Sequence, residues 1–413
     1  MNIECCFKIK EKFLNKINPK SVCDTFCLGS KCKRCIPSMK PTNAICGLNA
    51  DWITEEILAM ARPIDNFVKN FAVVDSLLKN NIMAIFNLQE VDEHAFCGNG
   101  NLNNLFSYDS KDFTSRQIAC YHFPIKDYKV PTVTLALEIC KAMHDCLQKF
   151  KVAVHCHAGY GRTGLIIAAY LMFSKRIGPM EVIALIRAKR KGSIQNRLQE
   201  DFLITFYNFI SNLWIQYPID NSFNAFTITQ FIDNQRKLLN SVEFFEIQYI
   251  PKIIFLLCQN LISKFHQLDG SGQREDFNSE DPCFKYFFMR SFDLVRNEDK
   301  ILNVPPSSLK ISGAEQRNYK KNFINQLLTP EDESLLKFHL SHWKEVINMS
   351  YNWDEMIRKE LSNIRTCFHL IIDWFFSLKQ PIITIQDLSE IDINSTSFPH
   401  IFFNNNKVGK QRD

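Results

Sequence analysis

The ten residues from His155 to Gly164, HCHAGYGRTG, constrain the fold most strongly because they join two apolar segments of different kinds. The short run VAV (152–154) precedes them, and the uninterrupted run LIIAAYL (165–171) follows them. A short apolar run of this kind is typical of a buried strand, and the longer run predicts a buried helix. We therefore expect a strand, a glycine-rich loop and a helix in succession, with the polar loop residues at the joint.

The loop carries a cysteine and an arginine separated by five residues. Cys156 precedes the N-terminus of the predicted helix, where unpaired N–H groups and the helix dipole stabilise a thiolate. Arg162 has a planar guanidinium that can bind two phosphate oxygens. Backbone N–H groups can surround a tetrahedral anion because three glycines allow tight turns and close approaches: Gly159, Gly161 and Gly164. The combination predicts a nucleophilic cysteine at a phosphate site rather than a buried cysteine at an ordinary turn.

The same ten residues resemble the signature HC-x5-R-[ST] of the cysteine-dependent protein tyrosine and dual-specificity phosphatases. The resemblance runs from about Ile45 to about Leu213 and includes ICGLNADWITEEILAMARP, IFNLQEVDEHAFCGN, YHFPIKDYKVP and IRAKRKGSIQ. These segments look most like the group called protein tyrosine phosphatase domain-containing protein, a neighbour of the mitotic-exit dual-specificity phosphatases. The resemblance implies an α/β fold with a central, mainly parallel sheet flanked by helices, followed here by a mostly helical C-terminal region.

The resemblance also implies roles for the loop residues. Thr163 places a hydroxyl where it can bond the thiolate or help to expel it, and His155 is expected to order the loop through hydrogen bonds rather than to act as a base. The substrate phosphate is expected to bind the residues between the cysteine and the arginine together with the arginine itself: His157, Ala158, Gly159, Tyr160, Gly161 and Arg162.

A phosphatase of this kind needs a general acid to protonate the departing oxygen. In the resembled family the acid is an aspartate on a loop that precedes the cysteine, and Asp127 in FPIKDYKVP occupies such a place. It follows a predicted strand over 118–123 and precedes a predicted helix opened by Pro131. The loop lacks the Trp-Pro-Asp triplet of many tyrosine phosphatases, so Asp109 and Asp112 remain alternatives, as does an ordinary solvated turn aspartate at 127.

The second step of such a reaction needs a positioned water molecule. A helix opened by Pro179 and ended by Gly192 is followed by SIQNRLQEDFL. Related phosphatases carry a glutamine here, and we choose Gln199 first and Gln195 second. Either residue could instead be a polar helix-start residue.

The length of 413 residues exceeds one phosphatase domain and predicts a second folded region. We expect a cysteine-containing N-terminal extension (1–42), a phosphatase domain (43–215), a helical accessory region (216–390) and a loose tail (391–413). No apolar run has the length of a membrane span, and no secretory signal opens the chain. With 15 cysteines and a reduced thiolate required, we expect a cytoplasmic protein; a centrosomal or ciliary location follows only by analogy with the resembled group.

Four N-terminal cysteines have the spacing C-x3-C-x4-C-x2-C: Cys23, Cys27, Cys32 and Cys35. This spacing could supply four thiolates to zinc, although the resembled group shows a comparable cluster without a metal role known to us. The catalytic scheme itself needs no metal and no cofactor. Cys5 and Cys6, beside basic residues, could alternatively be S-acylated.

Three functions remain open. The first is hydrolysis of phosphotyrosine, and of phosphoserine and phosphothreonine, in phosphoprotein substrates. The second is a phosphoinositide phosphatase, which His157 and Tyr160 disfavour because related lipid enzymes often carry lysines in this loop. The third is a non-catalytic scaffold that binds phosphoproteins. Nucleic-acid binding has no support, and the helical C-terminal region offers a surface for a protein partner. A basic cluster after the predicted helix could border the pocket or be a solvated helix end: Lys175, Arg176, Arg187, Lys189, Arg190, Lys191 and Arg197.

Overall fold

A computed structural model describes residues 28–32, 43–217, 226–268 and 333–378 of the chain. The chain divides into two compact units, Met1–Asn212 and Leu213–Asp413. The predicted boundaries at 42, 215 and 390 stay predictions. Among the N-terminal cysteines, Cys5, Cys6, Cys23, Cys27 and Cys35 lie outside the described residues, and so does the predicted tail.

The first unit is built on a five-stranded sheet in the order β1-β2-β5-β3-β4. The β1–β2 pair is antiparallel, and the pairs β2–β5, β5–β3 and β3–β4 are parallel. The central, mainly parallel sheet predicted for this region is therefore confirmed. The strands are β1 (Ala50–Trp52), β2 (Ile57–Met60), β3 (Ile82–Asn87), β4 (Ala119–His122) and β5 (Lys151–His155).

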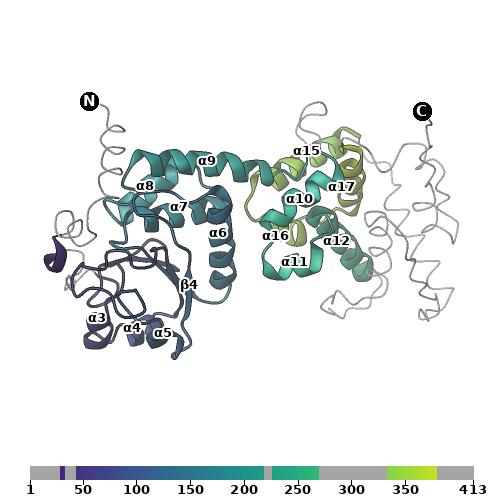
Figure 1. Ribbon diagram of the computed structural model, residues 1–413. Coiled ribbons are helices and arrows are strands. Elements are labelled where there is room, and N and C mark those ends of the chain that lie inside the picture. Colours follow the sequence, from purple (N-terminus) through teal and green to yellow (C-terminus); the bar gives the residue numbers. More distant parts are fainter. Residues whose placement is uncertain (1–27, 33–42, 218–225, 269–332, 379–413) are drawn as a thin grey trace, which may run out of the picture. The chain divides into compact units, whose positions relative to one another are not determined.

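Helices flank both sides of this sheet (Figure 1). The short helices α3 (Asp65–Asn70), α4 (Val73–Lys79) and α5 (Lys111–Thr114) lie on one side. The helices α6 (Val133–Leu147), α7 (Gly161–Lys175), α8 (Pro179–Lys189) and α9 (Arg197–Leu213) lie on the other. Near the N-terminus, a single 3-10 turn, η2, covers Gly29–Lys31.

The strand–loop–helix unit forms as predicted. β5 lies between β2 and β3 and is buried from Val152 to His155, which explains its apolar run at residues 152–154. α7 is buried at every position from Gly161 to Met172, so the apolar run of this helix reflects burial on all sides. The helix begins at Gly161, earlier than the apolar run suggested, and Arg162 therefore lies in its first turn.

The neighbouring elements also agree with the sequence. β4 falls within the predicted strand 118–123, and α6 begins at Val133, where the Thr132 hydroxyl accepts the backbone N–H of Leu135. α8 begins at Pro179 and ends at Lys189, before Gly192.

The described part of the second unit is helical, as expected. Its core is aromatic and aliphatic: Trp374 is fully buried, and its indole N–H donates to the carbonyl of Gln216 at 2.8 Å. Pro251 lies between two helices, α11 and α12, where proline interrupts the helical hydrogen bonds. The helices are α10 (Ile228–Leu238), α11 (Ser241–Ile247), α12 (Lys252–Leu268), α15 (Glu333–Met349), α16 (Trp353–Lys359) and α17 (Ile364–Phe376).

Among the described residues, no helix combines the length and the apolar character needed to cross a membrane.

Candidate active site

The end of β5 and the start of α7 hold the cysteine–arginine loop in place. Cys156 follows the last residue of β5 and is 4% exposed, and Arg162 in the first turn of α7 is 1% exposed. The N–H of Gly164 donates to the carbonyl of Tyr160 at 3.0 Å, which closes the first helical turn. Because both ends of the loop belong to buried elements, Cys156 and Arg162 are held on a rigid frame.

Two of the loop glycines are required by their surroundings. Gly159 has φ +74°, and a Cβ added there would lie 2.2 Å from the carbonyl oxygen of Met60, at the end of β2. A Cβ at Gly161 would lie 2.7 Å from Gln195 Oε1 and 3.1 Å from Gln199 Nε2. The glycines therefore let a neighbouring strand and two amide side chains approach the loop backbone.

Arg162 is bound by two carboxylates. Its two terminal nitrogens lie 2.6 Å from the two carboxylate oxygens of Glu93, and its Nη2 lies 2.8 Å from Asp127 Oδ1. Nη1 also donates to the carbonyl of Ile125 at 2.7 Å. Burial alone would lower the pKa of Arg162, but Glu93, Cys156 and Asp127 outweigh it and raise the pKa, so the guanidinium stays charged.

The Nε of Arg162 is buried and has no hydrogen-bond partner among the described residues. A buried donor without a partner is costly. An anion such as a phosphate oxygen, which accepts strongly from a guanidinium, is suited to this donor.

Asp127, the aspartate chosen first from the sequence, lies beside Arg162. Its Oδ2 is 3.2 Å from His94 Nε2, and its Oδ1 accepts the N–H of Tyr128 at 3.0 Å. Burial would raise the pKa of Asp127, but the His94 hydrogen bond and the positive charge of Arg162 prevail and lower it to about 2. Asp127 is therefore ionised at neutral pH.

The two alternative aspartates have other surroundings. Asp109 accepts the N–H of Lys111 at 2.9 Å in the turn before α5, and Asp112 lies within α5 itself. Of the three candidates, the structure brings Asp127 to the guanidinium of Arg162.

His155 makes hydrogen bonds of the ordering kind that we expected. Its Nε2 lies 2.9 Å from the hydroxyl of Tyr108, and its Nδ1 lies 3.2 Å from the carbonyl oxygen of Cys156. Burial lowers the pKa of His155 to about 3, so the ring is neutral. The Thr163 hydroxyl is buried and makes no hydrogen bond within the described residues, so the expected bond to the thiolate is not formed in this arrangement.

Two loop side chains turn into the protein rather than toward a substrate. The His157 ring stacks on the His94 ring at 3.8 Å between centroids, and its Nε2 lies 3.9 Å from Cys32 Sγ. Burial lowers the pKa of His157 to about 4. The Tyr160 hydroxyl accepts from Asn49 at 3.0 Å. His157 and Tyr160 thus support the loop, and any contact with phosphate at these positions comes from their backbone.

Arg190 corrects part of the picture of a basic cluster at the pocket mouth. Its side chain is 1% exposed, donates to the carbonyl of Gly159 at 2.7 Å and forms an ion pair with Asp51. Its guanidinium also lies over the Tyr160 ring, 4.3 Å from the centroid. Arg190 therefore supports the loop through Gly159 and Tyr160 and does not belong to an exposed basic surface.

Both candidate glutamines reach the loop. Gln199, 1% exposed, accepts the backbone N–H of Gln195 through its Oε1 at 2.8 Å. Between them, Asn196 donates to the carbonyl of Tyr128 at 3.2 Å. This segment therefore contacts both the loop, at Gly161, and the residue next to Asp127.

The sequence reasoning did not find Glu93 and His94, and it gave Arg62 no role. Arg62 is 2% exposed and donates to the carbonyl oxygens of Glu93 and Cys97, each at 3.3 Å. It thereby holds the loop that carries Glu93 and His94. Both residues lie in the segment IFNLQEVDEHAFCGN, which already resembled the phosphatases. This segment is an irregular loop, so no periodicity in the sequence indicates which of its side chains face Arg162.

Comparison with known proteins agrees with this geometry. The family model described as "Polymorphic toxin system, DSP-PTPase phosphatase" matches residues 65–176, which include the loop, Glu93 and Asp127. The protein tyrosine phosphatase domain-containing protein 1 of Mus musculus is 38% identical over 259 residues, which cover 62% of this chain and 35% of that protein. This chain therefore contains a phosphatase domain of the cysteine-dependent protein tyrosine and dual-specificity superfamily.

Other phosphatases of the superfamily match smaller parts of the chain. The tyrosine-protein phosphatase CDC14 homolog of Schizosaccharomyces pombe is 30% identical over 156 residues, covering 35% of this chain and 26% of that protein. The crystal structure of Tk-PTP in the active form is 24% identical with a TM-score of 0.33, covering 38% of this chain and 96% of that one. The chain spans about a third of the length of the first curated phosphatases that it matches.

Proposed function

We propose that this protein hydrolyses phosphotyrosine, and also phosphoserine and phosphothreonine, in phosphoprotein substrates through a phosphocysteine intermediate. One observation carries the proposal: Cys156 shares a rigid loop with Arg162, whose buried Nε lacks a partner among the described residues and whose Nη2 lies 2.8 Å from Asp127. A nucleophile, an anion-binding cation and a proton carrier thus belong to one site.

In the first step, Cys156 Sγ attacks phosphorus, an S–P bond forms and the bond to the substrate oxygen breaks. Arg162 Nε and the loop N–H groups from His157 to Gly161 bind the phosphoryl oxygens. Asp127 donates a proton to the departing oxygen. A bound phosphate dianion offsets the charge of Arg162, so it raises the pKa of Asp127 above this low value and allows the carboxyl group to carry that proton.

In the second step, water attacks phosphorus, Asp127 takes a proton from the water, and the S–P bond breaks to release inorganic phosphate and the thiolate. Gln199 is our first choice to orient the water, with Gln195 second, because both side chains approach the loop at Gly161. The buried Thr163 hydroxyl, which makes no hydrogen bond among the described residues, is available to donate to the departing thiolate. Both steps use only side chains of this chain.

A phosphoinositide substrate is the second candidate. One relative with 29% identity over 132 residues is the phosphatidylinositol 3,4,5-trisphosphate 3-phosphatase and protein-tyrosine-phosphatase PTEN2A of Arabidopsis thaliana. In the present chain, Arg162 is the one cationic side chain among residues 156–162 at neutral pH, because His157 is neutral and faces Cys32. A headgroup with several phosphates favours more positive charge than this, so we place protein substrates first.

A non-catalytic scaffold that binds phosphoproteins is the third candidate. Asp127 in contact with Arg162 favours turnover over simple binding, since binding phosphate needs no proton carrier. We expect the helical region after Leu213 to bind a protein partner. A centrosomal or ciliary location stays a prediction by analogy.

The test is a panel of phosphotyrosine, phosphoserine and phosphothreonine peptides, phosphoinositides and an aryl phosphate, with reduced protein. We expect turnover of phosphopeptides by the wild type and none by Cys156→Ser, which should still bind oxyanions such as tungstate. Turnover of aryl phosphate by Cys156→Ser contradicts the mechanism. Preference for phosphoinositides supports the second candidate, and no turnover of any substrate between about pH 5 and 8 supports the scaffold.

A further inference from the structure

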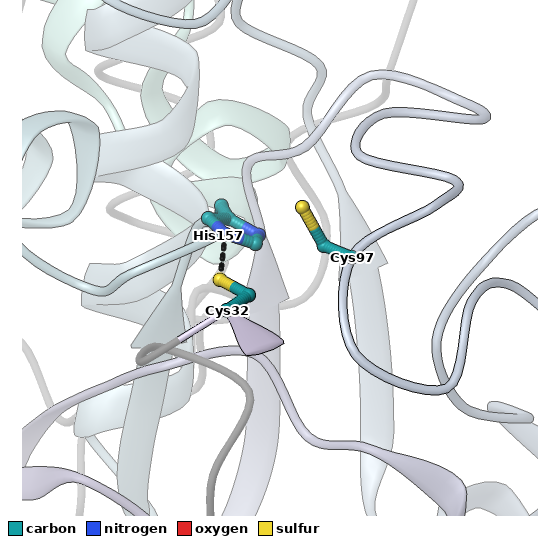
Figure 2. Close-up of side chains that lie close together, drawn as sticks. All are labelled: Cys32, Cys97 and His157. Atoms are coloured by element: carbon teal, nitrogen blue, oxygen red, sulfur yellow. Dashed lines mark hydrogen bonds between the residues drawn. The ribbon is translucent and has the colours of Figure 1, made fainter. Parts of the chain in front are cut away.

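A buried cluster of two thiols and an imidazole includes His157 of the catalytic loop and lies next to His94. Cys32, Cys97 and His157 are 2%, 1% and 6% exposed, and their ligand atoms all lie within 4.8 Å of one another. Figure 2 shows the three side chains close together: Cys32 directly follows η2, Cys97 lies in the loop after Glu93, and His157 lies in the cysteine–arginine loop. Cys97 and His157 follow Cys32 by 65 and 125 positions in the sequence, yet the fold brings the three side chains together.

The chemistry of this set favours a particular ion. Thiolates and imidazole are the ligands that zinc prefers in proteins. A tetrahedral zinc ion places a sulfur and a nitrogen ligand roughly 3.6 Å apart, and two sulfurs roughly 3.8 Å apart. Cys32 Sγ and His157 Nε2 are 3.9 Å apart, so small side-chain adjustments suffice to bind the ion.

A second observation also points to a ligand. The Nδ1 of His157 is buried and has no hydrogen-bond partner among the described residues, and the Nε2 of the same ring faces a thiol rather than a strong acceptor. The two ring nitrogens of His157 therefore have few hydrogen bonds for a buried side chain, which is unusual for buried polar atoms.

We propose that Cys32, Cys97 and His157 bind one structural Zn²⁺ ion, which joins the N-terminal segment to the catalytic loop. The two thiols release their protons on binding, and a non-thiolate ligand, nitrogen or oxygen, completes the tetrahedron. His94 does not share the ion in this arrangement: its ring is stacked on that of His157 with 18° between the planes, and a metal lies in the plane of a ring that binds it. His94 instead approaches Cys97, with its Nδ1 3.7 Å from Sγ.

The site explains why a turn near the N-terminus is placed against the catalytic unit. The N–H of Gly98 donates to the carbonyl of Gly29 at 3.1 Å, so the two cysteine-bearing segments already meet through their backbones. Zinc there would fix the loop that carries Glu93 and His94, and through them the surroundings of Arg162 and Asp127. The role is structural and is independent of the phosphatase proposal.

The sequence alone suggested another metal site, made of Cys23, Cys27, Cys32 and Cys35. The two sites share Cys32 and differ at Cys97, which lies outside the N-terminal cluster. Cys97→Ser is therefore the decisive variant, the triple variant Cys23→Ser/Cys27→Ser/Cys35→Ser is its counterpart, and Cys46→Ser, at an exposed cysteine, is the matched control.

The experiment measures zinc by elemental analysis in the full chain, purified with a phosphine reductant and without chelators, then reconstituted with Zn²⁺. We expect about one zinc ion per chain in the wild type, in Cys46→Ser, in the triple variant and in Cys156→Ser, and at least a fivefold loss in Cys97→Ser. Cobalt substitution should give thiolate-to-cobalt charge-transfer bands that Cys97→Ser lacks. Retention of zinc by Cys156→Ser separates this site from zinc captured by the nucleophile.

A second measurement needs no variant, in case Cys97→Ser fails to fold. Alkylation of the native wild type, read by mass spectrometry, should modify Cys32 and Cys97 several times faster after zinc is chelated, whereas labelling of Cys46 should not change. The proposal is overturned if the wild type binds no zinc, if Cys97→Ser retains it, if the triple variant loses it, or if Cys32 and Cys97 form a disulfide under these reducing conditions.

Discussion

The Glu93 carboxylate spans the end of the Arg162 side chain, with one oxygen 2.6 Å from each terminal nitrogen of the guanidinium. Both side chains are almost fully buried, at 8% and 1% exposure. A bidentate pair of this kind fixes the plane of the guanidinium. Glu93 therefore determines the direction in which Arg162 Nε points before any substrate arrives.

Replacing Glu93 should leave the guanidinium of Arg162 free to rotate. We expect Glu93→Ala to lower kcat/KM on the order of 100-fold, since misplacing a positioned cation by about 1 Å has that effect. The same change leaves a buried cation with fewer partners, so the free energy of unfolding should fall by about 3 kcal/mol. Steady-state kinetics and urea denaturation measure the two effects, with Glu90→Ala, an exposed residue of the same loop, as the control. Equal kinetics in the two variants would show that Glu93 does not position Arg162.

Asp127→Asn tests the general acid. We expect kcat for phosphopeptides to fall on the order of 100-fold or more, because the departing alkoxide or phenolate then leaves without a proton. The loss should be smaller with an aryl phosphate whose phenol is acidic. Rates are compared with those of Asp109→Asn and Asp112→Asn, the other two aspartates that the sequence allowed. If either of these loses more activity than Asp127→Asn, the assignment moves to that residue.

The sequence predicted the catalytic loop well because its constraints are local. β5 and α7 are both buried on all sides, so their apolar runs are unbroken, and the glycines, Cys156 and Arg162 sit in one short window between them. The order of elements from β4 to α9 followed from similar local signals, such as Thr132 and Pro179 at helix starts.

What the sequence could not predict depends on long-range contacts. Glu93 meets Arg162 across 69 positions, and Arg190 meets Asp51 across 139, so no spacing rule connects them. The basic cluster after α7 illustrates the same limit: Arg190 and Lys191 are adjacent, yet the first is buried against the loop and the second is exposed. Only the fold distinguishes a bracing arginine from a solvated lysine.

His155 should make stability depend on pH. Burial lowers the pKa of His155 from 6.5 to about 3 in the folded chain. Between these two pH values the unfolded chain binds a proton at His155 and the folded chain does not. Stability from this residue is therefore lost as pH falls below 6.5, by up to about 2 kcal/mol at about pH 5. Urea midpoints between about pH 7 and 5 measure the slope, which should be shallower in His155→Asn than in the wild type. An unchanged slope in His155→Asn would mean that other groups cause the acid sensitivity.

Gln199 and Gln195 can be separated by which step each variant slows. Gln199 is buried and accepts the N–H of Gln195, whereas the side chain of Gln195 is largely exposed. If Gln199 orients the hydrolytic water, Gln199→Ala should leave the first step nearly intact and slow the second about tenfold or more, so that phosphocysteine accumulates. Rapid-quench kinetics with an aryl phosphate should then show a burst of one phenol per active site followed by slow turnover, and intact-protein mass spectrometry should detect the phosphorylated chain. Gln195→Ala, examined in the same way, should turn over without a burst. A burst in Gln195→Ala but not in Gln199→Ala would exchange the two roles and leave Gln199 as the residue that holds the start of α9 against Gly161.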